Sequence, residues 1–170
     1  MSHRPRRLVL YILARDNEDG RIKEEIARRP SFLLALSRRA LHSTEADARW
    51  QLADALGFVD AADAEVEPLL VQFYNDSDEY VSRRALLAIG NRRSDKAEAL
   101  ALRSWDTGLE YQQIAALHVL SHIGSAQFEV FRQMAERDPR QYLANAAMTH
   151  AVPERRSSPP LPKGLRLKNE

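Results

Sequence analysis

Apolar residues recur at intervals of three and four along most of the chain, the spacing that keeps them on one face of an α-helix. In residues 47–57, for example, Ala48, Leu52 and Ala55 share one face. No segment shows the strict alternation of a β-strand. The single Asp-Gly dipeptide, Asp19-Gly20, is flanked by polar residues and not by β-branched runs. The pattern therefore predicts an all-α fold.

Short breakers divide the chain into helical segments of about ten to fifteen residues. Ser77 and Asp78 offer side-chain acceptors for the free N–H groups of a first helical turn. Gly57, Gly90 and Gly124 end three segments, and we expect each to adopt the left-handed conformation that stops a helix at little steric cost. The full set of breakers is Gly20, Pro30, Ser43-Thr44, Gly57, Asp76-Ser77, Gly90, Thr107-Gly108, Gly124 and Asp138-Pro139.

Three segments end alike, at residues 47–57, 80–90 and 114–124, and their closing glycines are 33 and 34 residues apart. A second register agrees with the first: Tyr80, Tyr111 and Tyr142 recur every 31 residues, and each is followed five residues later by Ala. A repeat of this length with two helices per unit predicts a solenoid, because one helix pair cannot bury its apolar face alone.

The repeats resemble the HEAT-repeat family, including its short bacterial versions of the phycobilisome-lyase type. The family motif is an acidic or Pro turn, Val-Arg, two residues, Ala and a closing Leu-Gly. Residues 47–57 fit it best, 80–90 have Ser82 where Arg is usual, 114–124 keep only the end, and the copy from Gln141 keeps only the start. The resemblance covers about residues 30–151. It implies a right-handed α–α superhelix and is nearly silent on function.

We expect four helix pairs and an N-terminal helical cap in residues 1–29, since a solenoid needs a polar outer end. Residues 152–170 are rich in Pro and then basic, which predicts a disordered tail. The predicted pairs are Pro30–His42 with Glu45–Leu56, Asp63–Asn75 with Asp78–Ile89, Asp95–Trp105 with Leu109–Ile123, and Ala126–Glu136 with Pro139–His150, preceded by cap helices Arg6–Ala14 and Arg21–Arg28.

The net charge of +1 conceals a strong asymmetry along the chain. Residues 45–80 carry ten Asp and Glu against Arg49 alone. Two interpretations stay open: a docking surface for a basic partner, or a solvated rim with acids at helix N-termini, where the helix dipole favours them. Asp47 and Asp54 fit the second interpretation less well than the other acids do.

The composition is that of an ordinary globular protein, with 44% hydrophobic and 29% charged residues. The chain has no Cys, which excludes disulfides, thiolate catalysis and Cys-ligated metals. The basic start followed by the apolar run 8–14 is reminiscent of a signal peptide, but Arg15-Asp16 follows in place of a small-residue cleavage site. We interpret it as an amphipathic first helix and expect a cytoplasmic protein without a membrane-spanning segment.

In solenoids of this kind, the second helix of each pair lines the concave face. We expect a row of aromatic rings along this face, formed by Trp50, Tyr80, Tyr111 and Tyr142. Aromatic and Arg side chains dominate protein interfaces, so such a row predicts a binding surface. The alternative is that each ring packs at a helix start to cover its neighbour. The predicted protein-binding residues are Asp47, Trp50, Gln51, Asp54, Tyr80, Arg83, Arg84 and Tyr111.

The sequence contains little evidence for a catalytic, metal or cofactor site. His118 and His122 are four residues apart, but no HExxH accompanies them, so a surface pair without a ligand role is favoured. Residues 16–20 lack the ligand spacing of a calcium loop and are interpreted as a turn. No Gly-rich phosphate loop or nucleophile elbow is present. We expect no enzymatic activity and no cofactor.

The sequence thus predicts a non-catalytic protein-binding module with a basic partner. It could serve as an immunity protein masking a toxin, or as an adaptor such as a chaperone-like subunit of a bilin lyase. The alternative is nucleic-acid binding through a groove lined by Arg83, Arg84, Arg92 and Arg93 together with the basic chain ends, as in the HEAT-like alkylpurine DNA glycosylases. The acidic neighbouring repeat opposes this alternative. The oligomeric state is left open.

Overall fold

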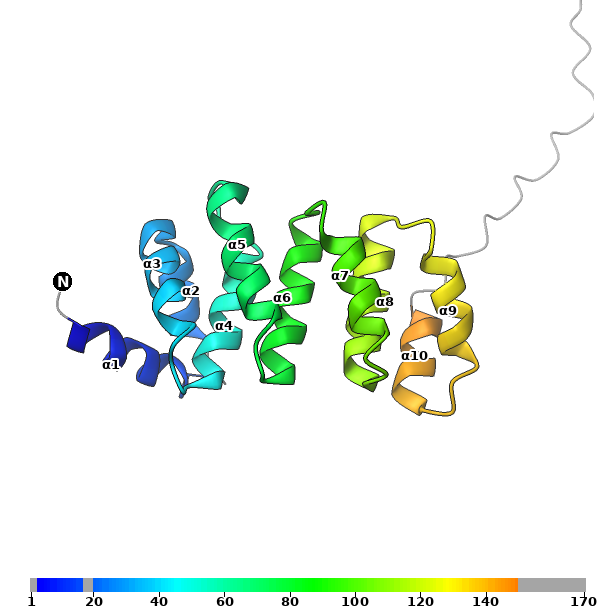
Figure 1. Ribbon diagram of the computed structural model, residues 1–170. Coiled ribbons are helices and arrows are strands. Elements are labelled where there is room, and N and C mark those ends of the chain that lie inside the picture. The colour runs from blue at the N-terminus through cyan, green and yellow to red at the C-terminus, as the bar shows by residue number, and fades with distance from the viewer. Residues whose placement is uncertain (1–2, 17–19, 150–170) are drawn as a thin grey trace, which may run out of the picture.

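The computed structural model describes residues 3–16 and 20–149, and within them it shows ten α-helices and no strand (Figure 1). This confirms the predicted all-α solenoid, and most helix ends lie within three residues of the predicted ones. The tail predicted for residues 152–170 lies outside the described residues. The helices are α1 (His3–Leu13), α2 (Arg21–Ala27), α3 (Pro30–Ala40), α4 (Ala46–Leu56), α5 (Asp63–Tyr74), α6 (Glu79–Asn91), α7 (Ala97–Trp105), α8 (Glu110–Ile123), α9 (Phe128–Glu136) and α10 (Gln141–Thr149).

The helices form an elongated row of hairpins, in the order α3–α4, α5–α6, α7–α8 and α9–α10, with α1 and α2 against the first hairpin (Figure 1). The second helices α4, α6, α8 and α10 pack on one another along the whole row, whereas α5 and α7, and α7 and α9, have no comparable contact. Closer packing along one side curves the row toward that side. The second helices therefore lie on its concave side.

The core is built of Leu, Ile, Val and Ala side chains that face inward from each hairpin, together with a few large aromatic side chains such as Phe73. Ala85 and Ala116, which follow the repeated tyrosines by five residues, are completely buried. Small side chains at these positions let neighbouring helix axes approach closely. Leu86 and Leu117, next along the chain, fill the space between helices and are also fully buried.

Two of the three closing glycines have a role different from the predicted one. Gly57 has a right-handed φ of −65°, and Gly90 lies inside α6. A Cβ at Gly57 would lie 2.9 Å from Ala88 Cα, and one at Gly90 would lie 2.8 Å from Val119 Cγ2. These glycines therefore let successive second helices touch. Only Gly124, at φ 74°, is left-handed as predicted.

Polar side chains link each hairpin to the next. Arg49 donates from Nε and Nη2 to the two carboxylate oxygens of Asp76, at 2.7 and 3.0 Å, and from Nη1 to the carbonyl of Ser43 at 2.7 Å. Arg92 donates to the carbonyls of Val59 and Ala61, at 2.9 and 2.8 Å. Both arginines tie a helix to a turn of the neighbouring hairpin, which fixes the spacing of the row.

Within the described residues, no helix combines the length and the apolar character needed to cross a bilayer.

Candidate functional site

A continuous row of aromatic side chains crosses the concave side, over α4, α6, α8 and α10. We call it the aromatic ladder and define it as Trp50, Tyr80, Arg83, Tyr111 and Tyr142. The Trp50 and Tyr80 rings meet edge to face at 5.3 Å between centroids, and the Tyr111 and Tyr142 rings stack at 6.3 Å. Arg83 joins these two pairs, because its guanidinium lies 4.7 Å from the Tyr80 ring centroid and 4.8 Å from that of Tyr111.

The repeat itself places the rings. Tyr80, Tyr111 and Tyr142 are each the second residue of a second helix, so stacking the hairpins brings the rings side by side. Trp50 lies one turn further into α4, where its Nε1 donates to Asp47 Oδ1 at 3.1 Å. The exposed fractions rise along the row, from 39% at Tyr80 through 47% at Tyr111 to 63% at Tyr142.

Arg83 is held by two tyrosine rings and an ion pair with Glu79. Its Nε lies 3.7 Å from Glu79 Oε1, close enough for an ion pair but too far for a hydrogen bond, and this buried Nε has no hydrogen-bond partner within the described residues. The guanidinium carbon lies over the faces of both tyrosine rings at cation–π distance, which restrains the side chain. The result is an oriented cation whose hydrogen-bonding capacity is not used by the described part of the chain.

A hollow of about 430 Å³ opens beside Arg83, between α6 and α8. We call it the central hollow. Leu87 and Ile114 contribute half-buried apolar surface to it, and His118 contributes an exposed imidazole. No Asp or Glu is among its lining residues, which are Tyr80, Arg83, Arg84, Leu87, Tyr111, Ile114, Ala115 and His118.

A family model for HEAT repeats matches residues 33–108 and 67–151, and the two matches together run from residue 33 to residue 151. The chain belongs to the HEAT-repeat family. HEAT repeats generally serve as scaffolds for protein interactions and are typically non-catalytic. No match to the chain was found among curated proteins or among solved structures.

The HEAT array brings together most of the predicted binding residues, but Gln51 is an exception. Its side chain is 1% exposed, and its Nε2 donates to the Leu13 carbonyl at 2.7 Å. Gln51 is buried because the N-terminal helices pack over this side of α4, which the periodicity of α4 alone does not reveal. The expectation that Gln51 contacts a partner is therefore wrong, and the residue anchors the cap instead.

Asp47 and Asp54 stay on the concave side, but Asp54 is already paired. Its carboxylate accepts from Lys23 Nζ at 2.9 Å and from Arg84 Nη2. Arg84 also lies 5.7 Å from the Trp50 ring centroid. Asp54 thus links the cap, α4 and α6, and little of its charge is left to attract a partner. Asp47 remains exposed beside Trp50.

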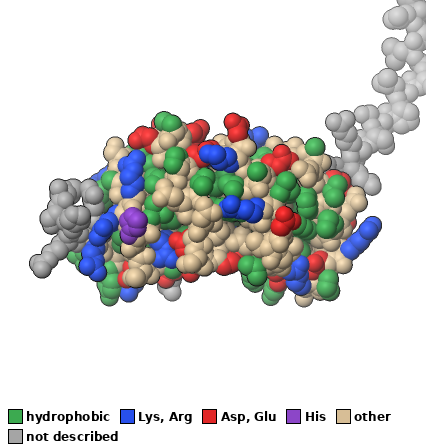
Figure 2. Space-filling view, in the orientation of Figure 1, with side chains coloured by type: hydrophobic (Ala, Val, Ile, Leu, Met, Phe, Trp, Pro, Cys, Tyr) green, Lys and Arg blue, Asp and Glu red, His purple; other side chains and the backbone are tan. Residues whose placement is uncertain are grey.

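Most acids of residues 45–80 are used in the same way, as links from one HEAT repeat to the next or to the N-terminal cap. Their cationic partners lie 27–31 residues away in the sequence, which is about one repeat. Figure 2 shows acidic and basic side chains interspersed on the visible face. The pairs are Arg15–Glu45, Lys23–Asp54, Arg38–Glu65, Arg49–Asp76, Arg84–Asp54, Arg92–Asp63 and Lys96–Glu67.

The carboxyls with clearly lowered pKa values lie outside the central hollow. Hydrogen bonds from Lys96 and then Ser94 lower the pKa of Glu67 below its ordinary value. Side-chain hydrogen bonds from Arg132 lower the pKa of Glu129 to about 2, and those from Arg140 lower the pKa of Asp138 to about 2. These shifts reflect ion pairs that support the helices and their connections, not a catalytic group.

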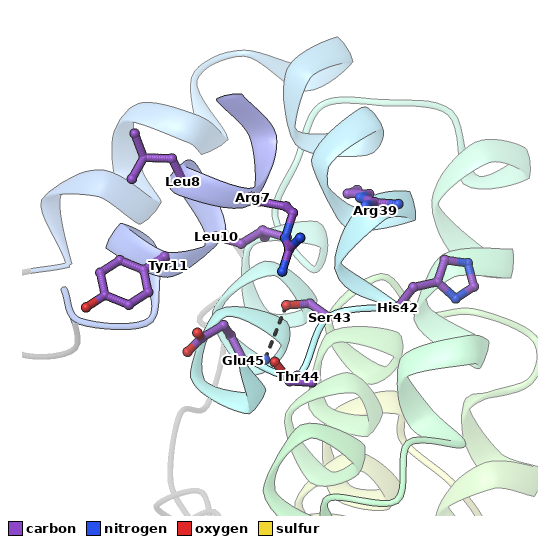
Figure 3. Close-up of a pocket in the computed structure, with 9 residues that line it drawn as sticks. All are labelled: Arg7, Leu8, Leu10, Tyr11, Arg39, His42, Ser43, Thr44 and Glu45. Carbon is purple, nitrogen blue, oxygen red and sulfur yellow. Dashed lines mark hydrogen bonds between the residues drawn. The ribbon is translucent and has the colours of Figure 1, made fainter. Parts of the chain in front are cut away.

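A second hollow, also of about 430 Å³, lies between α1 and the turn from α3 to α4 (Figure 3). Arg7, Arg39 and His42 line it together with the hydroxyls of Ser43 and Thr44. In Figure 3 Arg7 points toward Ser43, whereas His42 points away from both. The basic groups share a surface without converging on one point.

The His118 and His122 rings lie parallel on α8, 6.4 Å apart. Over residues 3–16 and 20–149, no three His, Cys, Asp or Glu side chains gather in a way that would hold a metal ion. His118 instead belongs to the lining of the central hollow. The repeat indicates that His118 faces the same side as Leu87, because His118, Leu87 and Asp54 occupy the same position in their second helices.

Proposed function

We propose that this HEAT-repeat chain is a non-catalytic module that binds another protein through the aromatic ladder. The support for it is that Tyr80, Tyr111 and Tyr142 are well exposed and yet belong to one continuous row joined by Arg83. Tyrosine, tryptophan and arginine are the residue types that contribute most to binding at protein interfaces. Contiguous exposed aromatic surface on a folded protein is characteristic of an interaction site.

The alternative, in which each ring only covers its neighbour, accounts for part of the ladder. Trp50 is half-buried and bonded to Asp47, which suits a packing role. Tyr142 is 63% exposed at the other end of the row, and Tyr111 of α8, on which it stacks, is still 47% exposed. A packing role does not explain a ring placed there, whereas a binding role does.

Two finer roles use the same surface: an adaptor or chaperone-like subunit, and an immunity protein that covers a toxin. The acidic stretch predicted a basic partner for either role. Pairing of these acids between repeats weakens that basis, and Asp47 is the acid that stays exposed beside the ladder. A role as an immunity protein further predicts that a toxic partner loses its toxicity when the two proteins are produced together.

The proposal is tested by affinity capture from cell extract with two matched double variants. Tyr111→Ser/Tyr142→Ser removes two exposed rings of the ladder. Val130→Ser/Met134→Ser removes two comparably exposed apolar side chains from α9, a first helix of its hairpin. We expect the ladder variant to lose proteins that the wild type and the α9 variant retain. Equal recovery by all three would contradict binding through the ladder.

Nucleic-acid binding is the second candidate, and one observation favours it: rings alternate with a guanidinium along the row, as on surfaces that stack unpaired bases. However, the rings already contact one another, edge to face for Trp50 and Tyr80 and stacked for Tyr111 and Tyr142, and Arg84 is paired with Asp54. Phosphate binding needs several available cations. A gel shift of single-stranded oligonucleotide at low salt that disappears in Tyr111→Ser/Tyr142→Ser would favour this function over the first.

A further inference from the structure

We propose that the central hollow binds a peptide segment of the partner in which an apolar side chain is flanked by a carboxylate. The carboxylate would accept hydrogen bonds from Arg83, and the apolar side chain would lie on Leu87 and Ile114. This inference rests on the proposed function, since it names the chemistry that the same face recognises. It departs from the sequence-based expectation of a basic contact.

Arg83 is prepared for a carboxylate. Its guanidinium carbon lies over both tyrosine rings, and its Nε makes no hydrogen bond within the described residues, so the guanidinium has N–H groups left to bind a carboxylate. Glu79, the nearest acid, lies at 3.7 Å from Nε and makes no hydrogen bond to it. Because the rings hold the side chain in place before binding, little rotamer entropy is lost when a ligand arrives.

The charge around the hollow selects against a basic ligand. Arg83 and Arg84 line it and no carboxylate does; Arg84 is paired with Asp54, so the charge available to a ligand is that of Arg83, whose nearest acid, Glu79, lies 3.7 Å away without a hydrogen bond. The nearby carboxylate of Asp54 is shared between Lys23 and Arg84. For the same reason the chain's own residues 152–170, with five Lys and Arg against two Glu, are a poor match for the hollow.

The apolar part of the hollow sets the second requirement. Leu87 and Ile114 are half-buried and packed against the core, so they form a well-packed apolar surface beside Arg83. A volume of about 430 Å³ holds one or two side chains and not a folded surface. An extended acidic and apolar peptide satisfies both requirements at once.

The test uses three fluorescein-labelled peptides that share the same Leu and Phe positions. The remaining positions carry Asp and Glu in the first, Asn and Gln in the second, and Lys in the third. Fluorescence anisotropy at low salt should give a dissociation constant for the acidic peptide at least about tenfold lower than for the amide peptide, the size expected for a charge-assisted hydrogen-bonded pair. The Lys peptide should be the weakest, and added salt should reduce the preference.

Two single variants test whether Arg83 causes the preference for the acidic peptide. Arg83→Gln should bring the acidic and amide peptides to equal affinity, whereas Arg137→Gln, which alters an exposed arginine after α9, should leave the tenfold preference intact. Thermal melting followed by circular dichroism verifies that each variant is folded. In the wild type, NMR of the arginine Nε–H groups should show the Arg83 signal shifting with the acidic peptide.

Equal affinity for the acidic and amide peptides, or no binding of the acidic peptide at about 1 mM, would overturn the inference. A preference for the Lys peptide that Tyr111→Ser/Tyr142→Ser abolishes would also overturn it, while leaving the ladder as a protein-binding surface. If the ladder variant in addition captures the same proteins as the wild type, the proposed function fails as well.

Discussion

Tyr80, Tyr111 and Tyr142 show what a single repeated residue contributes to this molecule. Each is the second residue of a second helix, so the spacing of 31 residues in sequence becomes adjacency of rings in space. The sequence was sufficient to predict this row, because solenoid stacking converts sequence period directly into position. It did not predict that Arg83 would lie between two rings, since that depends on the offset between α6 and α8.

The exposure of the last ring separates a binding role from a packing role. Tyr142→Ala should change the free energy of unfolding by less than about 0.5 kcal/mol, because a side chain that is 63% exposed loses little buried area. Urea denaturation of the two proteins measures the difference. A loss of several kcal/mol would show that Tyr142 is there to hold α10 in place.

The Arg49–Asp76 pair is the most buried of the ion pairs between repeats, with both side chains 11% exposed. Arg49→Met should destabilise the fold by about 3 kcal/mol, since it leaves a buried carboxylate without its cation. Arg28→Met, which removes a pair 71% and 51% exposed, is the matched control and should cost at most about 0.5 kcal/mol. Similar losses in the free energy of unfolding for the two variants would mean that Arg49 does not hold neighbouring repeats together.

At the scale of helices, the apolar pattern and the breakers located nearly every helix, and the errors arose where one helix meets another. The sequence predicts a helix end at Gly90, but the residue lies within α6, facing Val119 of α8. The periodicity of α4 predicts that Gln51 is exposed, but the cap covers it. Local sequence gives a helix its length and its faces, but it does not give the distance to the next helix.

Gly90→Ala tests the close approach of α6 and α8. An alanine in a helix interior is ordinarily favoured over glycine by about 1 kcal/mol, but here its Cβ would lie 2.8 Å from Val119 Cγ2. We expect a net destabilisation of about 1–3 kcal/mol from overpacking. In a double-mutant cycle, Val119→Ala should relieve part of this cost; strict additivity of the two changes would contradict the contact.

The connection before α10 depends on Arg140, which donates to Asp138, to Gln113 Oε1 at 2.6 Å and to the Gly108 carbonyl at 2.8 Å. Because the folded-state pKa of Asp138 is lowered to about 2, this pair stabilises the fold above the ordinary pKa of 3.8 and is lost as the pH falls toward 2. Arg140→Met should raise the pKa of Asp138, as measured by NMR titration of its side-chain carboxyl carbon. An unchanged titration would show that Arg140 is not the cause.

At the scale of the whole molecule, the distribution of charge along the sequence differs from its distribution over the folded surface. The acidic stretch of residues 45–80 is matched by cations one repeat before or after it. The sequence therefore predicted the solenoid and much of the ladder, but it did not reveal which acids pair between repeats. The acids became links within the array, and the central hollow kept Arg83, Arg84 and His118.

Binding of another protein on the concave side is tested most directly by site-specific photo-crosslinking in cells. A photoreactive phenylalanine analogue would replace Tyr111 on α8, and in a second protein it would replace Val130 on α9, which is 60% exposed. The ladder position should form covalent adducts with a protein, and the α9 position should not. Adducts from position 130 alone, or from neither position, would contradict a binding surface on the second helices.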